Sequence, residues 1–229
     1  MKFANVGGRK THIKDARRGD IGIDYWSGLM VFAKKGPFLK YWRYVDGAPM
    51  LPKGYEDESE WHAAWKESII EDNQEVVLGD NNEHRADIYT GKYVIELQKS
   101  SIKLDLVQDR NIFYSKYTSE RLVWVVNCYR VFAGGGLRIG EKVGKNVYKL
   151  VWRRSKKWAV AISGEPNNDV FLDLSPKTSY LLKIWKYNEE LFCSIYKKSR
   201  FYDHYLAEVG KGEDEFLKRI SSINIEKNY

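Results

Sequence analysis

The stretch that decides the fold is HRADIYTGKYVIELQKSSI, residues 84–102. Two runs rich in β-branched and aromatic residues flank a Gly-Lys pair at 91–92, which predicts a β-hairpin with glycine first in a two-residue turn. This register sets Asp87 opposite Glu96. Because successive side chains of a strand point to opposite faces, the isoleucines and leucine gather on one face and the carboxylates on the other. A register shifted by one residue mixes the two faces.

The two opposed carboxylates need a neutralising partner, because like charges across a sheet destabilise the strand pair. One interpretation is solvent exposure together with a nearby basic side chain, from Arg85, Lys92 or Lys99. The other is a divalent cation, since two carboxylates and a backbone carbonyl suit Mg²⁺, which keeps its remaining positions for water and phosphate. The pattern alone leaves both interpretations open.

Moving outward, the flanking segments predict an α/β fold. Residues 59–72 have helical periodicity after Ser59, a residue type that caps helix N-termini, and residues 101–117 predict a second helix, with Ser100 as its cap. The continuous apolar run at 121–132 is typical of a buried central strand. The order of helix, strands, helix and strand indicates an α/β core.

The chain divides into three expected parts. Residues 1–54 are basic and aromatic and predict a small N-terminal β module. Residues 55–132 form the core. Residues 133–229 follow a Gly-Gly-Gly boundary and predict a β-rich C-terminal extension, in which KWAVAI at 157–162 is expected as a strand, before a charged helix near 212–221.

Composition narrows the function classes. Hydrophobic residues make up 43% of the 229 and the net charge is +7, so the chain is globular and its charge favours a polyanionic partner. Cys128 and Cys193 stand alone in apolar runs and predict buried thiols in a reducing compartment. We expect a cytosolic protein, because no signal peptide is recognisable and no apolar run reaches the ~20 residues that span a bilayer. No Walker A, His-Glu-x-x-His or Gly-x-Ser-x-Gly motif is present.

Several short motifs lie around the hairpin. They are His62 and Lys66; Arg85, Ala86 and Asp87; Glu96, Gln98 and Ser100; Arg110 and Tyr114; and Trp124. In these residues the chain resembles the competence protein CoiA-like family, a branch of the PD-(D/E)XK nuclease superfamily. The resemblance covers residues 60–130 well and implies a restriction-endonuclease-like core.

The resemblance also implies a metal-dependent phosphodiesterase. Asp87, Glu96 and the backbone carbonyl of Leu97 would hold Mg²⁺ or Mn²⁺, which activates water and stabilises the leaving oxygen. A further carboxylate is expected from Glu67, Glu71 or Glu75, among which the sequence does not choose; Glu75 is favoured because it opens the strand before the hairpin. Gln98 stands where superfamily members usually have lysine; a glutamine can orient water but cannot act as a base.

The expected partner is DNA, single- or double-stranded. The resemblance implies phosphate contacts from Arg85, Arg110, His62 and Lys66, with Tyr114 supporting Arg110 or stacking on a base. In the alternative interpretation Tyr114 packs in the core, Arg110 pairs with a neighbouring acid (Asp109 or Glu120), and His62 is a hydrogen-bonded structural histidine.

Two features outside the core bear on DNA binding. The run VWRRSKKW at 151–158 interleaves basic and aromatic residues, as a strand that follows a phosphate backbone does, although a solvated loop fits equally. The N-terminal module lacks the cysteine and histidine pairs that the family has there, so zinc is not expected in it. The leading hypothesis is a DNA nuclease; the alternatives are an inert nucleic-acid-binding protein on the same fold and a non-enzymatic interaction protein.

Overall fold

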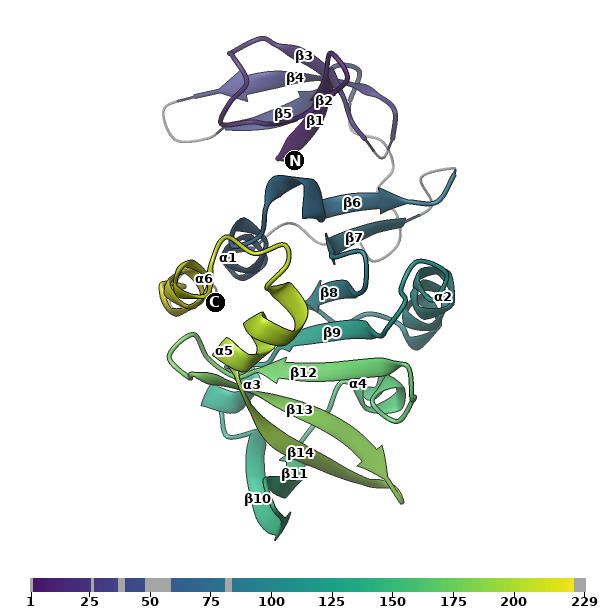
Figure 1. Cartoon of the computed structure of the whole chain (residues 1–229), viewed down its shortest axis with the longest axis vertical. Coiled ribbons are helices and arrows are strands. Elements are labelled where there is room, and N and C mark those ends of the chain that lie inside the picture. The colour runs from purple at the N-terminus through teal and green to yellow at the C-terminus, as the bar shows by residue number, and fades with distance from the viewer. Residues whose placement is uncertain (1, 26, 37–39, 48–58, 81–83, 225–229) are drawn as a thin grey trace. The chain divides into compact units, whose positions relative to one another are not determined.

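A computed structural model of the chain describes residues 2–25, 27–36, 40–47, 59–80 and 84–224. The chain forms two compact units, one of Met1–Tyr55 with Val77–Arg85 and the other of Glu56–Val76 with Ala86–Tyr229. Helices and two sheets are both present, which confirms the α/β class (Figure 1). Each unit is built around its own sheet, so each is described by itself.

The first unit holds a five-stranded antiparallel sheet in the order β2-β1-β3-β4-β5. Its strands are β1 (Phe3–Val6), β2 (Arg9–His12), β3 (Ile21–Ile23), β4 (Met30–Lys35) and β5 (Lys40–Tyr44). One face of the sheet buries a small core of Ala4, Ile13, Ala16, Val31, Ala33 and Trp42. The short strands expected in this region are therefore present.

The second unit holds most of a mixed sheet in the order β10-β11-β14-β13-β12-β9-β8-β7-β6, of which residues 77–78 and 84–85 group with the first unit. Its strands are β6 (Gln74–Leu78), β7 (His84–Tyr89), β8 (Val94–Gln98), β9 (Leu122–Asn127), β10 (Leu137–Gly144), β11 (Val147–Trp152), β12 (Asn168–Asp173), β13 (Tyr180–Tyr187) and β14 (Glu190–Lys197). At its centre β8, β9 and β12 run parallel and are almost wholly buried. Burial on both faces explains why these strands are apolar without strict alternation.

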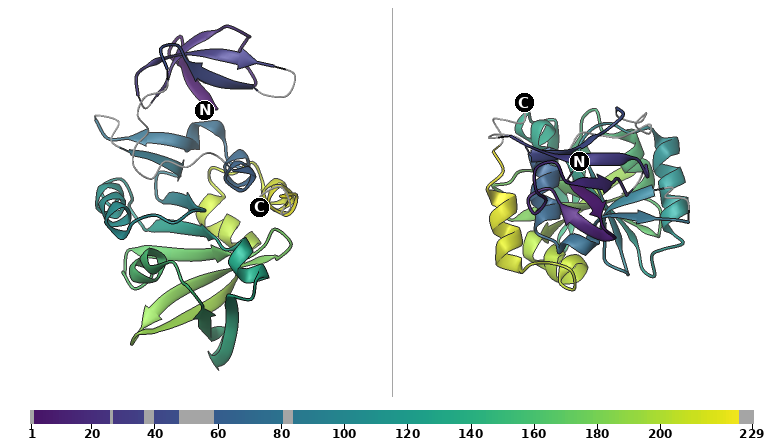
Figure 2. Two further views of the ribbon diagram at one scale, coloured as in Figure 1. Left: turned by 180° about the vertical axis from the view of Figure 1, so that it is seen from behind. Right: turned by 90° about the horizontal axis from the view of Figure 1, so that it is seen from above.

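Helices cover both faces of this sheet, as Figures 1 and 2 show. They are α1 (Glu60–Glu67), α2 (Leu104–Tyr114), α3 (Tyr129–Ala133), α4 (Lys157–Ile162), α5 (Lys198–Phe201) and α6 (Glu213–Ser221), with single turns at Glu71–Asn73 and Tyr202–Leu206. One face packs α1, α5 and α6 in an aromatic core that includes Trp61, Trp65 and Phe216. The other face carries α2 and α4, where Trp158 meets Trp124 edge to face.

The predicted hairpin register is confirmed near the turn, whereas the expected Asp87–Glu96 and Ala86–Leu97 pairs are not part of the described strand ladder. Ile88 pairs with Ile95 and Tyr89 with Val94, and the turn closes with the N–H of Thr90 donating to the carbonyl of Tyr93 at 3.0 Å. Gly91 has a φ of 84°, a backbone conformation that glycine adopts without strain and that a glycine-first turn requires. The predicted order of helix, strands, helix and strand is also present, as α1, β6 to β8, α2 and β9.

Four predictions of local structure were wrong. Of the apolar run at 121–132, only Leu122–Asn127 forms a strand, and the run continues into the helix Tyr129–Ala133. The first helix ends at Glu67 rather than 72, because the chain turns away there and the Ile70 N–H donates to the Val209 carbonyl. Residues 157–162 form a helix, not a strand; a six-residue apolar run is too short for periodicity to decide. Ser100 does not cap α2, whose N-cap position is Lys103 without a side-chain hydrogen bond.

Residues 133–229, expected as a β-rich extension, contribute β10 to β14 to the same sheet as β6 to β9. The parallel pairing of β12 with β9 joins the two parts over six residue pairs. In the described part of the chain, no helix has the length and apolarity to cross a membrane.

Candidate functional site

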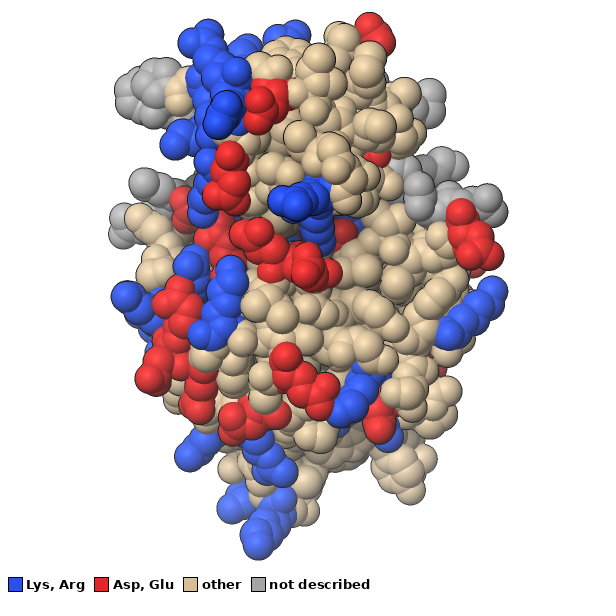
Figure 3. Space-filling model, turned by 45° about the horizontal axis from the view of Figure 1, so that its top comes forward, with Lys and Arg blue, Asp and Glu red and all other residues tan. Residues whose placement is uncertain are grey.

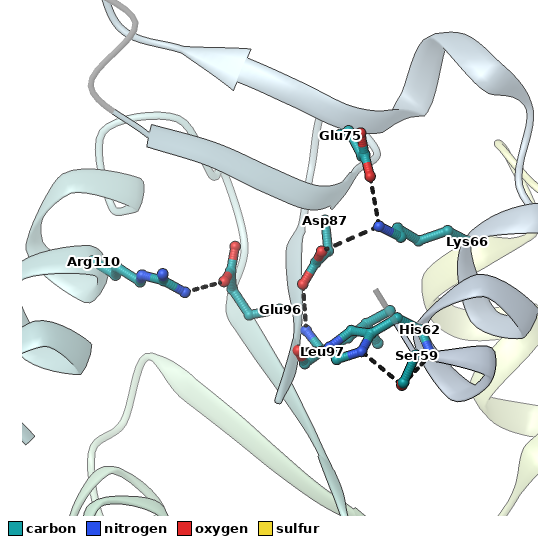
Figure 4. Close-up of polar contacts among 8 residues, drawn as sticks. All are labelled: Ser59, His62, Lys66, Glu75, Asp87, Glu96, Leu97 and Arg110. Carbon is teal, nitrogen blue, oxygen red and sulfur yellow. Dashed lines mark hydrogen bonds and ion pairs between the residues drawn. The ribbon is translucent and has the colours of Figure 1, made fainter. Parts of the chain in front are cut away.

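The site lies where β7 and β8 separate, beyond the Ile88–Ile95 pair (Figure 4). Beyond this pair, the backbone N–H and carbonyl of Leu97 form hydrogen bonds with side chains. Its N–H donates to Oδ2 of Asp87 at 2.9 Å, and its carbonyl accepts from Nε2 of His62 at 2.8 Å. We call this point the fork. The carboxylate of Asp87 therefore replaces a ladder hydrogen bond at the point where the strands diverge.

Hydrogen bonds at both ring nitrogens fix the orientation of His62. It lies on α1 and is buried, and Nε2 must carry the proton because a carbonyl accepts from it. Nδ1 then accepts from the hydroxyl of Ser59 at 3.0 Å, and the same hydroxyl accepts from the His62 N–H as the N-cap of α1. The predicted cap is confirmed. His62 therefore has the contacts of a structural histidine that fixes the Leu97 carbonyl.

Lys66 stands between two carboxylates. Its Nζ lies 2.7 Å from Oε1 of Glu75 and 3.8 Å from Oδ1 of Asp87, and its side chain is only 5% exposed. His62 and Lys66 are four residues apart and project from one face of α1, as the sequence predicted. The lysine ammonium is therefore a largely buried cation that neutralises part of the acidic charge of the site.

Glu75 has an unusual backbone. Its φ is 48°, in the left-handed region that residues with a side chain rarely adopt, at a cost on the order of 1–3 kcal/mol. Gln74 and Asn73 hold the flanking chain: their side-chain amides donate to the carbonyls of Ile69 and Tyr89, each at 2.6 Å. The conformation places the Glu75 carboxylate against Lys66, so the carboxylate favoured from the sequence does join the site.

Glu96 is the most perturbed group of the site. It is 2% exposed, and Nη1 of Arg110 lies 2.8 Å from its Oε2. The pKa of Glu96 is raised to about 7. Burial is the largest cause, and the negative charge of Asp87 also raises it, whereas Arg110 and a hydrogen bond from Tyr114 lower it. Its Oε1 has no hydrogen-bond partner among the described residues.

Arg110 and Tyr114 lie one turn apart on α2, and both turn inward to Glu96. Tyr114 is 1% exposed, so its ring packs in the core as one interpretation held. Burial raises the pKa of its hydroxyl well above the usual value, and Glu96 adds to that rise. Arg110 pairs with Glu96 and not with Asp109 or Glu120, the neighbours proposed from the sequence.

Gln98 follows Glu96 on the same face of β8 and is buried. Its side-chain Nε2 donates to the carbonyl of Ser100 at 3.3 Å. Nζ of Lys156 reaches the carbonyls of Lys99 and Ser100 from the start of α4, at 2.5 and 3.1 Å. The basic run at 151–158 is thus partly structural, because Lys156 fixes the loop after β8.

The predicted repulsion between Asp87 and Glu96 is offset by protein cations. Lys66 approaches Asp87 and Arg110 pairs with Glu96, whereas Lys92, one of the partners expected from the sequence, pairs with Glu208. Neutralisation of the carboxylates does not by itself require a metal. When Glu96 is ionised, three carboxylates face two basic side chains, so the cluster carries a net charge of 2 − 3 = −1.

An oxygen-binding divalent cation fits part of this arrangement. Asp87, Glu96 and the Leu97 carbonyl offer only oxygen ligands, and the free Oε1 of Glu96 is a buried acceptor. In residues 2–25, 27–36, 40–47, 59–80 and 84–224, no group of three or more His, Cys, Asp or Glu side chains is placed to hold a metal.

Sequence reasoning found the members of the site and missed their pairings. Arg85 lies on β7, is half-buried, and groups with the first unit. The Lys66–Glu75 and Arg110–Glu96 pairs join different elements, and no spacing rule predicts such contacts. The chain matches no family model, no curated protein and no solved structure, so the resemblance to the CoiA-like family rests on its motif residues alone.

Proposed function

We propose that the chain is a metal-dependent nuclease of the PD-(D/E)XK type that hydrolyses phosphodiester bonds in DNA. One observation carries the proposal: Glu96 is a buried carboxylate with a pKa near 7 and an oxygen without a hydrogen-bond partner in the described chain, and it lies beside Asp87 at the fork. Perturbed carboxylates cluster at functional sites more often than elsewhere.

The charge of the fork supports a cation. A buried ionised Glu96 leaves the cluster one positive charge short, and a cation on the free oxygen of Glu96 supplies it. Asp87 and Glu96 would hold Mg²⁺ or Mn²⁺, with the Leu97 carbonyl as a third ligand. An ion held by these residues would supply Lewis-acid chemistry, polarising the scissile phosphate and lowering the pKa of a bound water.

The residues of this chain have distinct parts in the proposed reaction. Asp87 keeps its carboxylate in place through the Leu97 N–H, and His62 holds the Leu97 carbonyl from the other side. Lys66 supplies the positive charge that Gln98 lacks, close to Asp87. The positive charge of Arg110 lowers the pKa of Glu96 and so partly offsets the effect of burial. Gln98 is left to orient water.

A catalytically inert nucleic-acid-binding protein is the second candidate. It is favoured by the two ion pairs, because Lys66 and Arg110 already satisfy much of the charge that a metal would. Glutamine at position 98 points the same way. In this case the fork is a structural ion-pair cluster on a nuclease-like fold.

The test is cleavage of labelled single- and double-stranded DNA with Mg²⁺, Mn²⁺ or EDTA. We expect metal-dependent cleavage by the unaltered chain and loss of at least about 100-fold in rate with Asp87→Asn or Glu96→Gln, since each removes a charged ligand. Glu141→Gln, an exposed carboxylate on β10, is the matched control and keeps full activity.

Cleavage that survives both substitutions removes the fork as the active site. Salt-sensitive binding without cleavage favours the inert binder. The proposed setting is the cytosol; the two cysteines, Cys128 and Cys193, are buried free thiols, which supports a reducing compartment without requiring it.

A further inference from the structure

The positive charge of the chain is concentrated in its first 55 residues. These contain 11 Lys and Arg against four Asp, a net charge of 11 − 4 = +7. The remainder contains 38 − 11 = 27 basic and 31 − 4 = 27 acidic residues and is neutral. In Figure 3 the blue of Lys and Arg gathers toward the top of the view, while red and blue mix over its middle. Any attraction for a polyanion therefore belongs mainly to the N-terminal segment.

The sheet of that segment is basic as well. Its five strands contain six Lys or Arg residues and no Asp or Glu. Asp24, which follows β3, is 3% exposed and accepts hydrogen bonds from Ser27 and Tyr44, so its charge is withdrawn from the surface. The strands present cations without interspersed acids.

Among the described residues, the second face of the sheet is covered only in part: Phe3 and His12 on it are buried, whereas several of its other residues are exposed. The inner face carries Val31, Ala33 and Trp42 in the core. Alternate residues point outward, and the strand register places them in three rows across the sheet. These rows are Lys10, Asn5, Ile23 and Met30; Ile21, Phe32 and Arg43; and Lys34 with Tyr41. We call this the outer face.

The outer face exposes large apolar side chains. Ile21 is 63% exposed, Ile23 48% and Met30 51%. They lie on adjacent strands, so they form one patch rather than scattered residues, and such patches mark interaction surfaces. Nζ of Lys34 lies 5.9 Å from the ring centre of Tyr41, so a cation stands beside an aromatic ring. A surface hollow lined by residues that include Tyr41 and Arg43 follows the edge strand β5.

We propose that the outer face binds a single-stranded polynucleotide. Bases would pack on the apolar and aromatic rows, while Lys10, Lys34 and Arg43 contact the phosphates. Charge complementarity selects a polyanion over a neutral protein, and exposed apolar side chains select a strand whose bases are unpaired, because a duplex presents its phosphates and hides its base faces. The inference goes beyond the nuclease proposal and does not depend on it.

The experiment is fluorescence anisotropy of the full chain in EDTA, with labelled oligo(dT), oligo(U) and a DNA duplex. We expect the single strands to bind at least about tenfold tighter than the duplex, with a slope of log affinity on log salt near −2 for three phosphate contacts. Lys34→Ser/Arg43→Ser lowers the magnitude of that slope by about 1.4. Lys142→Ser/Lys145→Ser, which removes two exposed cations from the other sheet, leaves the slope unchanged.

A second variant tests base contact separately. Tyr41→Ser weakens single-strand binding about tenfold with the salt slope kept, because stacking is not a charge interaction. Inorganic polyphosphate, which has no bases, competes poorly. The two oligonucleotide arms identify DNA or RNA as the natural strand.

The inference is overturned if both double variants lower the salt slope equally. It is also overturned by equal affinity for the duplex or by full competition from polyphosphate. Dimerisation in light scattering that Ile23→Lys abolishes overturns it too, because that result would assign the face to a second copy. Binding that persists in EDTA while Mg²⁺ and Mn²⁺ give no cleavage would sink the nuclease proposal alone, so the two outcomes are distinguishable.

Discussion

The substitution Glu96→Gln tests how the ionisation of Glu96 changes the free energy of unfolding. A protonated Glu96 and a glutamine have nearly the same shape and hydrogen-bonding groups. The variant therefore keeps the packing and removes the titration. The pKa of Glu96 is raised from 4.5 to about 7, chiefly by burial. Because the folded protein holds this proton more tightly than the unfolded chain, the carboxyl stabilises the fold below pH 4.5 relative to higher pH, and that advantage is lost as the pH rises from 4.5 to 7.

The magnitude follows from the shift. A rise from 4.5 to about 7 is about 2.5 units, and at about 1.4 kcal/mol per unit the full effect is on the order of 3 kcal/mol. At pH 5 part of the change has already occurred, so roughly 2–3 kcal/mol remains between pH 5 and pH 8.

Urea unfolding in EDTA at pH 5, 6, 7 and 8 measures the effect for both proteins. The wild type should lose roughly 2–3 kcal/mol relative to Glu96→Gln over this range, while titrating groups distant from the fork cancel in the difference. Parallel stability curves for the two proteins would refute the reasoning, because Glu96 would then ionise in the fold as easily as in the unfolded chain. Glu141→Gln is the control whose curve should stay parallel to the wild type.

Two further predictions concern the buried ion pairs and two concern the proposed metal. Arg110→Met should lower the free energy of unfolding by roughly 2–4 kcal/mol at pH 8, because a buried charge loses its partner, and by much less at pH 5, where Glu96 is protonated; equal losses at both pH values in urea titrations contradict this. Lys198→Met should lower the free energy of unfolding by roughly 3–5 kcal/mol, since Asp173 is fully buried and pairs with Lys198 at 3.0 Å. A loss below about 1 kcal/mol would show that Trp61 and Tyr129, which also donate to Asp173, stabilise its charge without Lys198. Mn²⁺ binding should release protons and weaken as the pH falls below about 7, because the ligand Glu96 must be ionised; calorimetry in two buffers that shows no proton release would exclude Glu96 as a ligand. Cleavage should be faster with Mn²⁺ than with Mg²⁺, because Mn²⁺ binds such sites more tightly, and equal rates in a gel assay would count against it.

The sequence predicted those parts of the fold that depend on local patterns. The hairpin register followed from the alternation of Ile88 and Ile95 with Asp87 and Glu96 and from Gly91 in the turn. The Ser59 cap and the buried β9 followed from residue type and apolar runs. These features are decided within about ten residues of chain, where propensity and periodicity act directly.

Pairings between distant elements lay beyond such patterns. Nothing local to Lys66 indicates that it lies between Glu75 and Asp87, because the contact depends on the left-handed backbone of Glu75 and on the packing of α1. The short apolar helix at 157–162 was mistaken for a strand because only its contact between Trp158 and Trp124 settles the matter. Tertiary packing overrides local preference at these positions.

The central claim is that Asp87 and Glu96 together hold a divalent cation at the fork. An anomalous-scattering map from a crystal soaked in Mn²⁺ at pH 8, where Glu96 is mostly ionised, tests it most directly. The account predicts a single peak within bonding distance of carboxylate oxygens from both residues, and its loss in Glu96→Gln crystals. A map without a peak at the fork, or with one that persists in Glu96→Gln, would contradict the claim.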